Sequence, residues 1–264
     1  MIVNFIKASP AQNTTILVTS YCPPEYYRKV ARTAIGYEYL YGEQVGFLVP
    51  PRGQDSVLRL EMSGGGFCGN GTLAAAAYAQ FSGITSEEAF YIDVSGTDRA
   101  LSCSVKKLTH FKYYASATMP PVRKYQKLDI FLEQETLTGY LIELEGIAHF
   151  IVETGPDFAL YEQTMEALKA ETRAEAIGLV PFQTLGDEIY KIKPYVHVRK
   201  TGTDIFERGC GSGSCALGVH LQETASIDGE ITVRQPGGVI KVKTGTAPVI
   251  STEVLFTCEG KIMI

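Results

Sequence analysis

Apolar and polar residues alternate over many short segments of this chain, and such alternation predicts half-buried β-strands. In the first half the predicted strands are Ile2–Ile6, Thr15–Thr19, Val45–Val49, Val57–Met62, Phe90–Val94, Leu101–Val105 and Lys112–Thr118. In the second half they are Thr138–Glu145, His149–Glu153, Ile189–Val198, Ile231–Val233 and Val239–Lys243. Many short strands with few helices between them indicate an α+β fold.

Helical spacing of apolar residues is confined to a few segments. It predicts helices at Pro24–Ile35, at the alanine-rich segment Thr72–Phe81 and at Glu162–Ile177. A shorter helix is expected at Ser214–Glu223. The two halves of the chain therefore use the same mixture of elements.

The proline-containing segment 119–122 is the best candidate for a linker between two domains. A chain of 264 residues is long enough for one large domain or for two domains of roughly 130 residues each. We expect two domains, residues 1–119 and 120–264.

Composition and charge narrow the functional classes. Hydrophobic residues make up 45% of the chain and the net charge is −5, with acidic and basic residues dispersed. We therefore expect no nucleic-acid partner and no membrane attachment. No apolar stretch approaches ~18 residues, and the N-terminus lacks a signal-peptide pattern. A cytoplasmic location is expected.

The cysteines are scattered and form no Cys-x-x-Cys pair. Such cysteines are usually free thiols in a cytosolic protein. The histidines have no spacing typical of a zinc site, so no metal site is expected. The six cysteines are Cys22, Cys68, Cys103, Cys210, Cys215 and Cys258.

Two of these cysteines occupy matching loops. Residues 67–74 read Phe-Cys-Gly-Asn-Gly-Thr-Leu-Ala, and residues 209–216 read Gly-Cys-Gly-Ser-Gly-Ser-Cys-Ala. Both loops have the pattern Cys-Gly-x-Gly, then a hydroxyl residue, then a predicted helix. They lie about half the chain apart, which indicates two similarly built halves.

A cysteine at the start of a helix can carry chemistry. The unpaired N–H groups and the partial positive charge of a helix N-terminus bind carboxylates. The same environment stabilises a thiolate, so we expect lowered pKa values for Cys68 and Cys210. Two such loops facing one substrate could remove the α-hydrogen of an amino acid on one face and return a proton on the other.

Phosphate binding and zinc binding are the alternatives for these glycine-rich loops. Neither loop contains the lysine of G-x-x-x-x-G-K-[ST], and neither reads G-x-G-x-x-G. A zinc ion held by Cys68 and Cys210 would need further ligands of suitable geometry. The paired thiols therefore favour acid–base chemistry.

With these motifs, the chain resembles the diaminopimelate epimerase-like family of cofactor-independent racemases, and within it the histidine racemase branch. The resemblance rests on both Cys-Gly-x-Gly loops, on Glu43-Gln44 before a predicted strand, and on the Gln-Pro-Gly-Gly turn at 235–238. It implies two pseudo-symmetric domains, each a β-barrel-like sheet around a central helix, with the active site between them. It also implies no cofactor, no metal, a small amino acid as substrate and a homodimer.

The resemblance extends to individual positions, which are assigned here as candidate site residues. Cys68 and Cys210 are the expected base and acid. The expected carboxylate-binding N–H groups are those of Gly69, Asn70, Gly211 and Ser212, and the other expected substrate contacts are Asn13, Glu43, Gln44, His149, Glu207 and Arg208.

The substrate prediction rests on departures from the diaminopimelate epimerases. Those enzymes hold the distal end of their substrate with asparagines, and this chain has Ile147-Ala148 and Tyr195 in the corresponding segments. Such a loss weakens the binding of a charged end group. We therefore expect a substrate other than diaminopimelate. The resemblance to the histidine racemase branch implies histidine as the substrate and a role in metallophore biosynthesis. Diaminopimelate or another polar amino acid is the alternative.

Functions of other classes also fit two reactive thiols. A redox or sensor protein could form a reversible disulfide between Cys68 and Cys210. An amino-acid binding protein would show affinity without exchange of the α-proton. A phenazine-type isomerase on the same fold would use an acid in place of the cysteine pair. This chain has both cysteines, which argues against that alternative.

Overall fold

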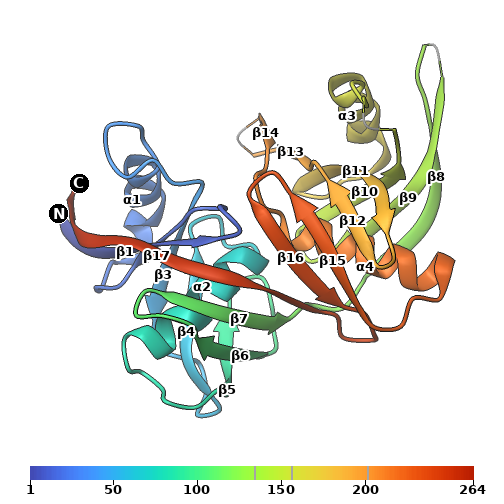
Figure 1. Cartoon of the computed structure of the whole chain (residues 1–264). Helices are drawn as coiled ribbons and strands as arrows, with labels where there is room; N and C mark the ends of the chain where they lie inside the picture. The colour runs from blue at the N-terminus through green and yellow to red at the C-terminus, as the bar shows by residue number, and fades with distance from the viewer. Residues whose placement is uncertain (134, 156, 201) are drawn as a thin grey trace. The chain divides into compact units, whose positions relative to one another are not determined.

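The computed structural model describes residues 1–133, 135–155, 157–200 and 202–264. The chain forms two compact units, Met1–Thr118 with Ser251–Ile264, and Met119–Ile250 (Figure 1). The sequence-based division instead placed residues 251–264 with the second half. They belong to the first unit because the last strand pairs antiparallel with the first, from Ile2 opposite Met263 to Pro10 opposite Val254.

The strands of the first unit form a closed sheet. Each strand from β1 to β7 pairs with the next, β7 pairs with β17, and β17 pairs with β1. This closure confirms the expected barrel-like arrangement. The strands are β1 (Ile2–Pro10), β2 (Thr15–Val18), β3 (Gln44–Val49), β4 (Ser56–Met62), β5 (Ala89–Val94), β6 (Leu101–Lys107), β7 (Lys112–Thr118) and β17 (Val249–Met263).

Helix α2 (Gly69–Phe81) lies within this barrel, where it contacts β1, β2, β3, β4, β6 and β7 (Figure 1). Its residues 73–77 are fully buried, so the helix is apolar around its whole circumference. A run of alanines at 74–77 lets the strands approach closely. Helix α1 (Tyr27–Ala34) follows the short 3-10 helix η1 (Pro24–Tyr26) and packs against β3, where the Tyr27 ring stacks on Phe47 at 3.7 Å between centroids.

The second unit also packs a large sheet against a buried helix. Its main sheet has the order β8, β9, β10, β11, β12, β15, β16, and β13 and β14 extend from the first part of β11. Its strands are β8 (Lys124–Phe131), β9 (Thr136–Leu144), β10 (Ile147–Glu153), β11 (Ala176–Gly186), β12 (Ile189–Ile192), β13 (Tyr195–Val198), β14 (Thr203–Phe206), β15 (Glu230–Gln235) and β16 (Gly238–Lys243).

The helices of the second unit cover opposite faces of strand β10. Helix α3 (Tyr161–Glu171) packs Met165 into a cluster with Ala148, Phe150 and Val152. Helix α4 (Gly211–Ala225) contacts β9, β10, β11 and β16 and is buried through residues 213–221. Since successive residues of a strand point to opposite faces, His149 points away from the α3 cluster.

Several predicted boundaries differ from the structure. The helix predicted over Glu162–Ile177 ends at Glu171, because Thr172 is extended and β11 begins at Ala176. The strand predicted over Ile189–Val198 divides at Lys193-Pro194, since proline cannot donate a ladder hydrogen bond. Strands β8, β11, β14 and β17 were not predicted, because their pairing partners are distant or their faces are partly polar. Within the described ranges, no helix is both long and apolar enough to cross a membrane.

Candidate active site

Cys68 caps the N-terminus of helix α2. Its sulfur accepts a hydrogen bond from the N–H of Gly71 at 3.2 Å, so the side chain satisfies one of the unpaired donors of the first turn. The Thr72 hydroxyl donates to the Cys68 carbonyl oxygen at 2.8 Å. The Cys-Gly-x-Gly-hydroxyl pattern thereby fixes both the sulfur and the backbone of this cysteine.

Cys210 has the same arrangement at the N-terminus of helix α4. The N–H of Gly213 donates to its sulfur at 3.2 Å. The Ser214 hydroxyl donates to the Cys210 carbonyl oxygen at 2.7 Å. Two segments far apart in the sequence thus build one local geometry twice, as the matching motifs predict.

A side chain at the third position after each cysteine would be crowded. A Cβ at Gly71 would lie 2.9 Å from the Met62 sulfur, and a Cβ at Gly213 would lie 3.0 Å from the Cys210 sulfur. A side chain would therefore press on Met62 in the first loop and on the thiol itself in the second.

The first turns of both helices also present backbone donors. The helical hydrogen-bond ladders begin with Thr72 N–H to the Cys68 carbonyl and with Ser214 N–H to the Cys210 carbonyl. The N–H groups of residues 69–70 and 211–212 precede these bonds and are not needed by the ladders. With the helix dipole, such a turn can hold a carboxylate.

A chain of amide side chains leads from Cys68 to Glu43. The Cys68 thiol donates to Gln44 Oε1 at 2.9 Å, and Gln44 Nε2 donates to Asn13 Oδ1 at 2.7 Å and to Thr15 Oγ1 at 2.8 Å. Asn13 Nδ2 in turn donates to Glu43 Oε2 at 2.9 Å. Asn13 is buried, whereas Glu43 is exposed at the end of this network. The structure therefore brings four of the sequence-predicted residues together.

Cys210 lies in different surroundings. Its backbone N–H donates to Gln235 Oε1 at 2.7 Å, and Gln235 Nε2 donates to Ser214 Oγ at 2.9 Å. Burial raises the pKa of the Cys210 thiol well above its usual value, and the nearby, hydrogen-bonded Glu207 carboxylate raises it further. The lowered pKa expected for Cys210 from its helix position is therefore wrong, because burial and Glu207 outweigh the Gly213 and Ser212 hydrogen bonds.

His149 reaches the second loop through Ser212. Its ring is fully buried on β10, and Nε2 lies 2.9 Å from Ser212 Oγ. Burial lowers the pKa of His149 to about 3, so the ring is neutral at physiological pH. Ser212 Oγ lies 3.6 Å from the Cys210 sulfur. The sequence-predicted residues His149, Ser212 and Cys210 therefore form one polar cluster.

The Gln-Pro-Gly-Gly turn holds the segment before Cys210. The Gly237 N–H donates to the Arg208 carbonyl oxygen at 2.7 Å, and Arg208 Nη2 donates to the Pro236 carbonyl at 3.5 Å. The Arg208 side chain is exposed. Thr15, Ser214 and Gln235 are polar site residues that the sequence analysis did not assign, although Gln235 stands in a motif that could have indicated it.

The other cysteines have surroundings of a different kind. Burial raises the pKa of Cys103 and of Cys215 to about 12, so both are protonated thiols at neutral pH. Burial also raises the pKa of Cys22, and Cys258 is exposed on β17. The residues that the structure describes contain no group of three or more histidine, cysteine, aspartate or glutamate side chains able to hold a metal ion.

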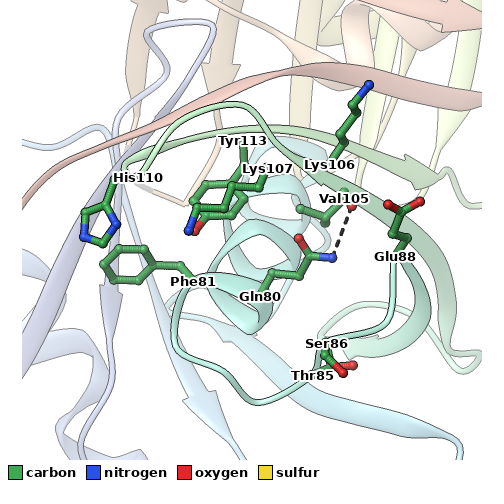
Figure 2. Close-up of a pocket in the computed structure, with 10 residues that line it drawn as sticks. All are labelled: Gln80, Phe81, Thr85, Ser86, Glu88, Val105, Lys106, Lys107, His110 and Tyr113. Carbon is green, nitrogen blue, oxygen red and sulfur yellow. Dashed lines mark hydrogen bonds between the residues drawn. The ribbon is translucent and has the colours of Figure 1, made fainter.

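A pocket of about 430 Å³ lies at the opposite end of α2 (Figure 2). It is lined by Gln80, Phe81, Lys107, His110 and Tyr113 among others, and Gln80 Nε2 donates to the Val105 carbonyl at 3.2 Å. A helix rises about 1.5 Å per residue, which puts Phe81 roughly 18 Å along the axis from Gly69. None of the candidate site residues lines this pocket.

The sequence matches known proteins over its whole length. Residues 2–263 match the family described as the histidine racemase CntK N-terminal domain. The chain belongs to this histidine racemase family. A histidine racemase of Fusobacterium nucleatum is 28% identical, covering 100% of this chain and 97% of the relative. A histidine racemase of Staphylococcus aureus is 26% identical, covering 100% and 98%. A diaminopimelate epimerase of Xanthomonas axonopodis is 26% identical over only 74% of this chain and 70% of its own.

Solved structures confirm the fold of this family member. A hydroxyproline epimerase of Agrobacterium vitis aligns with a TM-score of 0.74 at 11% identity, covering 99% of this chain and 92% of the other. A probable proline racemase of Agrobacterium radiobacter aligns with a TM-score of 0.73 at 14% identity and the same coverage. A phenazine biosynthesis family protein of Bacillus anthracis gives 0.69 at 12%, covering 100% of both chains. The expected diaminopimelate epimerase-like α+β fold is therefore confirmed.

Proposed function

We propose that this protein is a histidine racemase that inverts the α-carbon with two thiols, Cys68 and Cys210. The observation that carries the proposal is the duplicated thiol geometry, in which each sulfur accepts an N–H at 3.2 Å at the start of a buried helix. Membership of the histidine racemase family supports histidine as the substrate. In this mechanism one thiol removes the α-proton and the other returns a proton to the opposite face of the α-carbon.

The substrate carboxylate binds at the helix N-termini. The N–H groups of Gly69, Asn70, Gly211 and Ser212 precede the first ladder bonds, and both helix dipoles favour negative charge at these ends. When the α-proton leaves, negative charge spreads onto the carboxylate. Donors already in place then stabilise the transition state without reorganisation.

The remaining polar residues hold the ammonium and imidazole groups. Glu43 is exposed, and Asn13 fixes one of its carboxylate oxygens, so Glu43 offers an oriented acceptor for a cationic or N–H group. Gln44 orients both Asn13 and Cys68. Glu207 lies beside the second thiol, and in this proposal Glu207 and the neighbouring Arg208 contact the substrate from that side.

The two sulfurs account for both proton transfers of the reaction. One thiolate takes the α-proton and becomes a thiol, while the other thiol gives its proton to the opposite face of the carbanion and becomes a thiolate. No electrons leave the substrate, and no group is transferred. The enzyme ends each turnover with its proton on the other sulfur, ready for the opposite enantiomer.

Proton NMR of L-histidine in D₂O with reduced enzyme tests this proposal. We expect the α-proton signal to disappear while circular dichroism of the amino acid decays toward zero. Cys68→Ser and Cys210→Ser should each lower the rate by about 10²-fold or more, because each removes a positioned acid–base group. Cys258→Ser, the same change at an exposed site, is the matched control and should leave the rate unchanged.

A panel of substrates separates the alternatives. Exchange with diaminopimelate but not histidine would overturn the substrate assignment. Full activity in both Cys→Ser variants would overturn the two-thiol mechanism. Histidine binding by calorimetry without any α-proton exchange would instead make the protein a binding module.

A further inference from the structure

The Ser212 hydroxyl lies between His149 and Cys210. Its oxygen is 2.9 Å from His149 Nε2 and 3.6 Å from the Cys210 sulfur. Ser212 is the second residue of α4 and is half-buried, whereas His149 is fully buried on β10. The side chains come from two elements, so their proximity is a product of the fold and not of the loop motif alone.

The position of the His149 ring depends on a glycine in the neighbouring strand. His149 pairs with Gly178 in the parallel register of β10 and β11. A Cβ at position 178 would lie 2.0 Å from His149 Nδ1 and 2.5 Å from Cε1. Such contacts are far inside van der Waals distance, so the ring can occupy this place only because residue 178 has no side chain.

The surroundings of the ring determine which nitrogen carries the proton. The ring is neutral, so one nitrogen is a donor and the other an acceptor. Among the described residues, Nδ1 has no hydrogen-bond partner, and it is buried. A proton on Nδ1 would leave a buried N–H unsatisfied, which is rare in proteins. The proton therefore belongs on Nε2, which donates to Ser212 Oγ.

This tautomer gives the Ser212 hydroxyl a direction. Its oxygen accepts from His149, which leaves the hydroxyl hydrogen to point elsewhere, and the Cys210 sulfur is the acceptor within reach. We propose that His149 is a positioning residue, which makes Ser212 donate its hydroxyl hydrogen to the Cys210 sulfur and so stabilises the thiolate. It acts through Ser212 and needs no contact with the substrate. The catalytic importance of this bond rests on the proposed function.

Opposing groups act on the same sulfur. Burial and the Glu207 carboxylate disfavour the Cys210 thiolate, whereas the Ser212 hydroxyl and the Gly213 N–H favour it. A racemase that uses Cys210 as a base in one direction needs the two groups that stabilise its thiolate, the Ser212 hydroxyl and the Gly213 N–H. Removing the oriented hydroxyl should therefore make the thiolate harder to form.

Alkylation of Cys210 by iodoacetamide at a series of pH values measures this directly. Only the thiolate reacts, and peptide mass spectrometry separates Cys210 from the other cysteines. We expect Ser212→Ala to raise the midpoint of the Cys210 profile by about half a pH unit or more, as a lost hydrogen bond to a charged group implies. Ser104→Ala, the same change on exposed β6, should leave the midpoint unchanged.

A pair of histidine variants tests the relay. His149→Gln keeps a donor near the place of Nε2 and should retain the wild-type midpoint, whereas His149→Met fills similar volume without a donor and should match Ser212→Ala. Combining His149→Met with Ser212→Ala should add no further shift. Ser212→Ala lies on a half-buried helix start, so it remains informative if a buried histidine variant fails to fold.

Each outcome has a single meaning. An unchanged midpoint in Ser212→Ala, or additive shifts in the double variant, would overturn the positioning role. The alkylation profile does not require turnover, so it decides this role even if the wild-type protein shows no exchange with histidine. In a racemising wild type, the acid limb of the kcat/KM profile should move with the alkylation midpoint.

Discussion

Replacing Gly178 with alanine perturbs one contact without touching any thiol. The new Cβ would lie 2.0 Å from His149 Nδ1, so either the ring must rotate away from Ser212 or strand β11 must move. The backbone itself tolerates alanine, because Gly178 is not among the residues with positive φ. Alanine even removes some freedom of the unfolded chain, which would stabilise the protein by about 0.4–1 kcal/mol.

Overpacking opposes that gain and should outweigh it. Forcing a methyl group into a filled core costs about 1–3 kcal/mol, so we expect a net loss of unfolding free energy. For domains of about 150–250 residues, each kcal/mol lowers Tm by about 2–4 °C. Differential scanning calorimetry measures this shift. Gly229→Ala is the matched control in the same unit, since a Cβ there meets no atom within 4 Å.

A double-mutant cycle tests whether the contact between residues 149 and 178 causes this loss of stability. In His149→Ala/Gly178→Ala the methyl group occupies space that the imidazole has left, so the two costs should not add. Directly contacting residues typically show coupling energies of about 0.5–3 kcal/mol. If the cost of the double variant equals the sum of the single costs, the close contact between residues 149 and 178 is not what excludes a side chain at 178. Gly178→Ala alone should also move the Cys210 alkylation midpoint as Ser212→Ala does.

Three further outcomes follow from the site. Gln44→Leu should lower kcat/KM and destabilise the first unit by about 1–3 kcal/mol, since it leaves buried Asn13 without its donor; denaturant titration and the exchange assay check both. Glu207→Gln should move the Cys210 alkylation midpoint to lower pH, because a carboxylate that raises this thiol pKa is removed; an unchanged or raised midpoint would contradict it. Cys103 and Cys215, whose pKa values are about 12, should remain unalkylated in the native protein at pH 8.

The local geometry around each cysteine could be predicted from the sequence because the residues of each motif lie close together in the chain. Cysteine, the glycine three positions later and the hydroxyl residue after it are neighbours in the chain, and a helix N-terminus fixes how they face one another. The sequence therefore predicted a helix after each of these cysteines, although both helices begin three residues earlier than predicted, at Gly69 and Gly211. The Asn13 and Glu43-Gln44 positions came from the family resemblance, and the structure joins them in one network.

Other features depend on contacts between distant segments, which a single sequence does not display. The pairing of β17 with β1 places the end of the chain in the first unit, and no local pattern indicates it. The space for His149 is made by Gly178 in another strand. The raised pKa of Cys210 likewise comes from burial, whereas the helix position alone predicts the opposite direction.

The two thiols share a backbone geometry, and the charge environment of Cys210 matters for a racemase. L and D enantiomers have equal free energies, so an efficient enzyme must reach both of its protonation states. Burial and Glu207 hold the proton on Cys210, which would favour the state able to act on only one enantiomer. A hydroxyl donor directed at that sulfur reduces the imbalance. On this view Ser212, held by a buried neutral histidine, makes the thiolate state of Cys210 easier to reach.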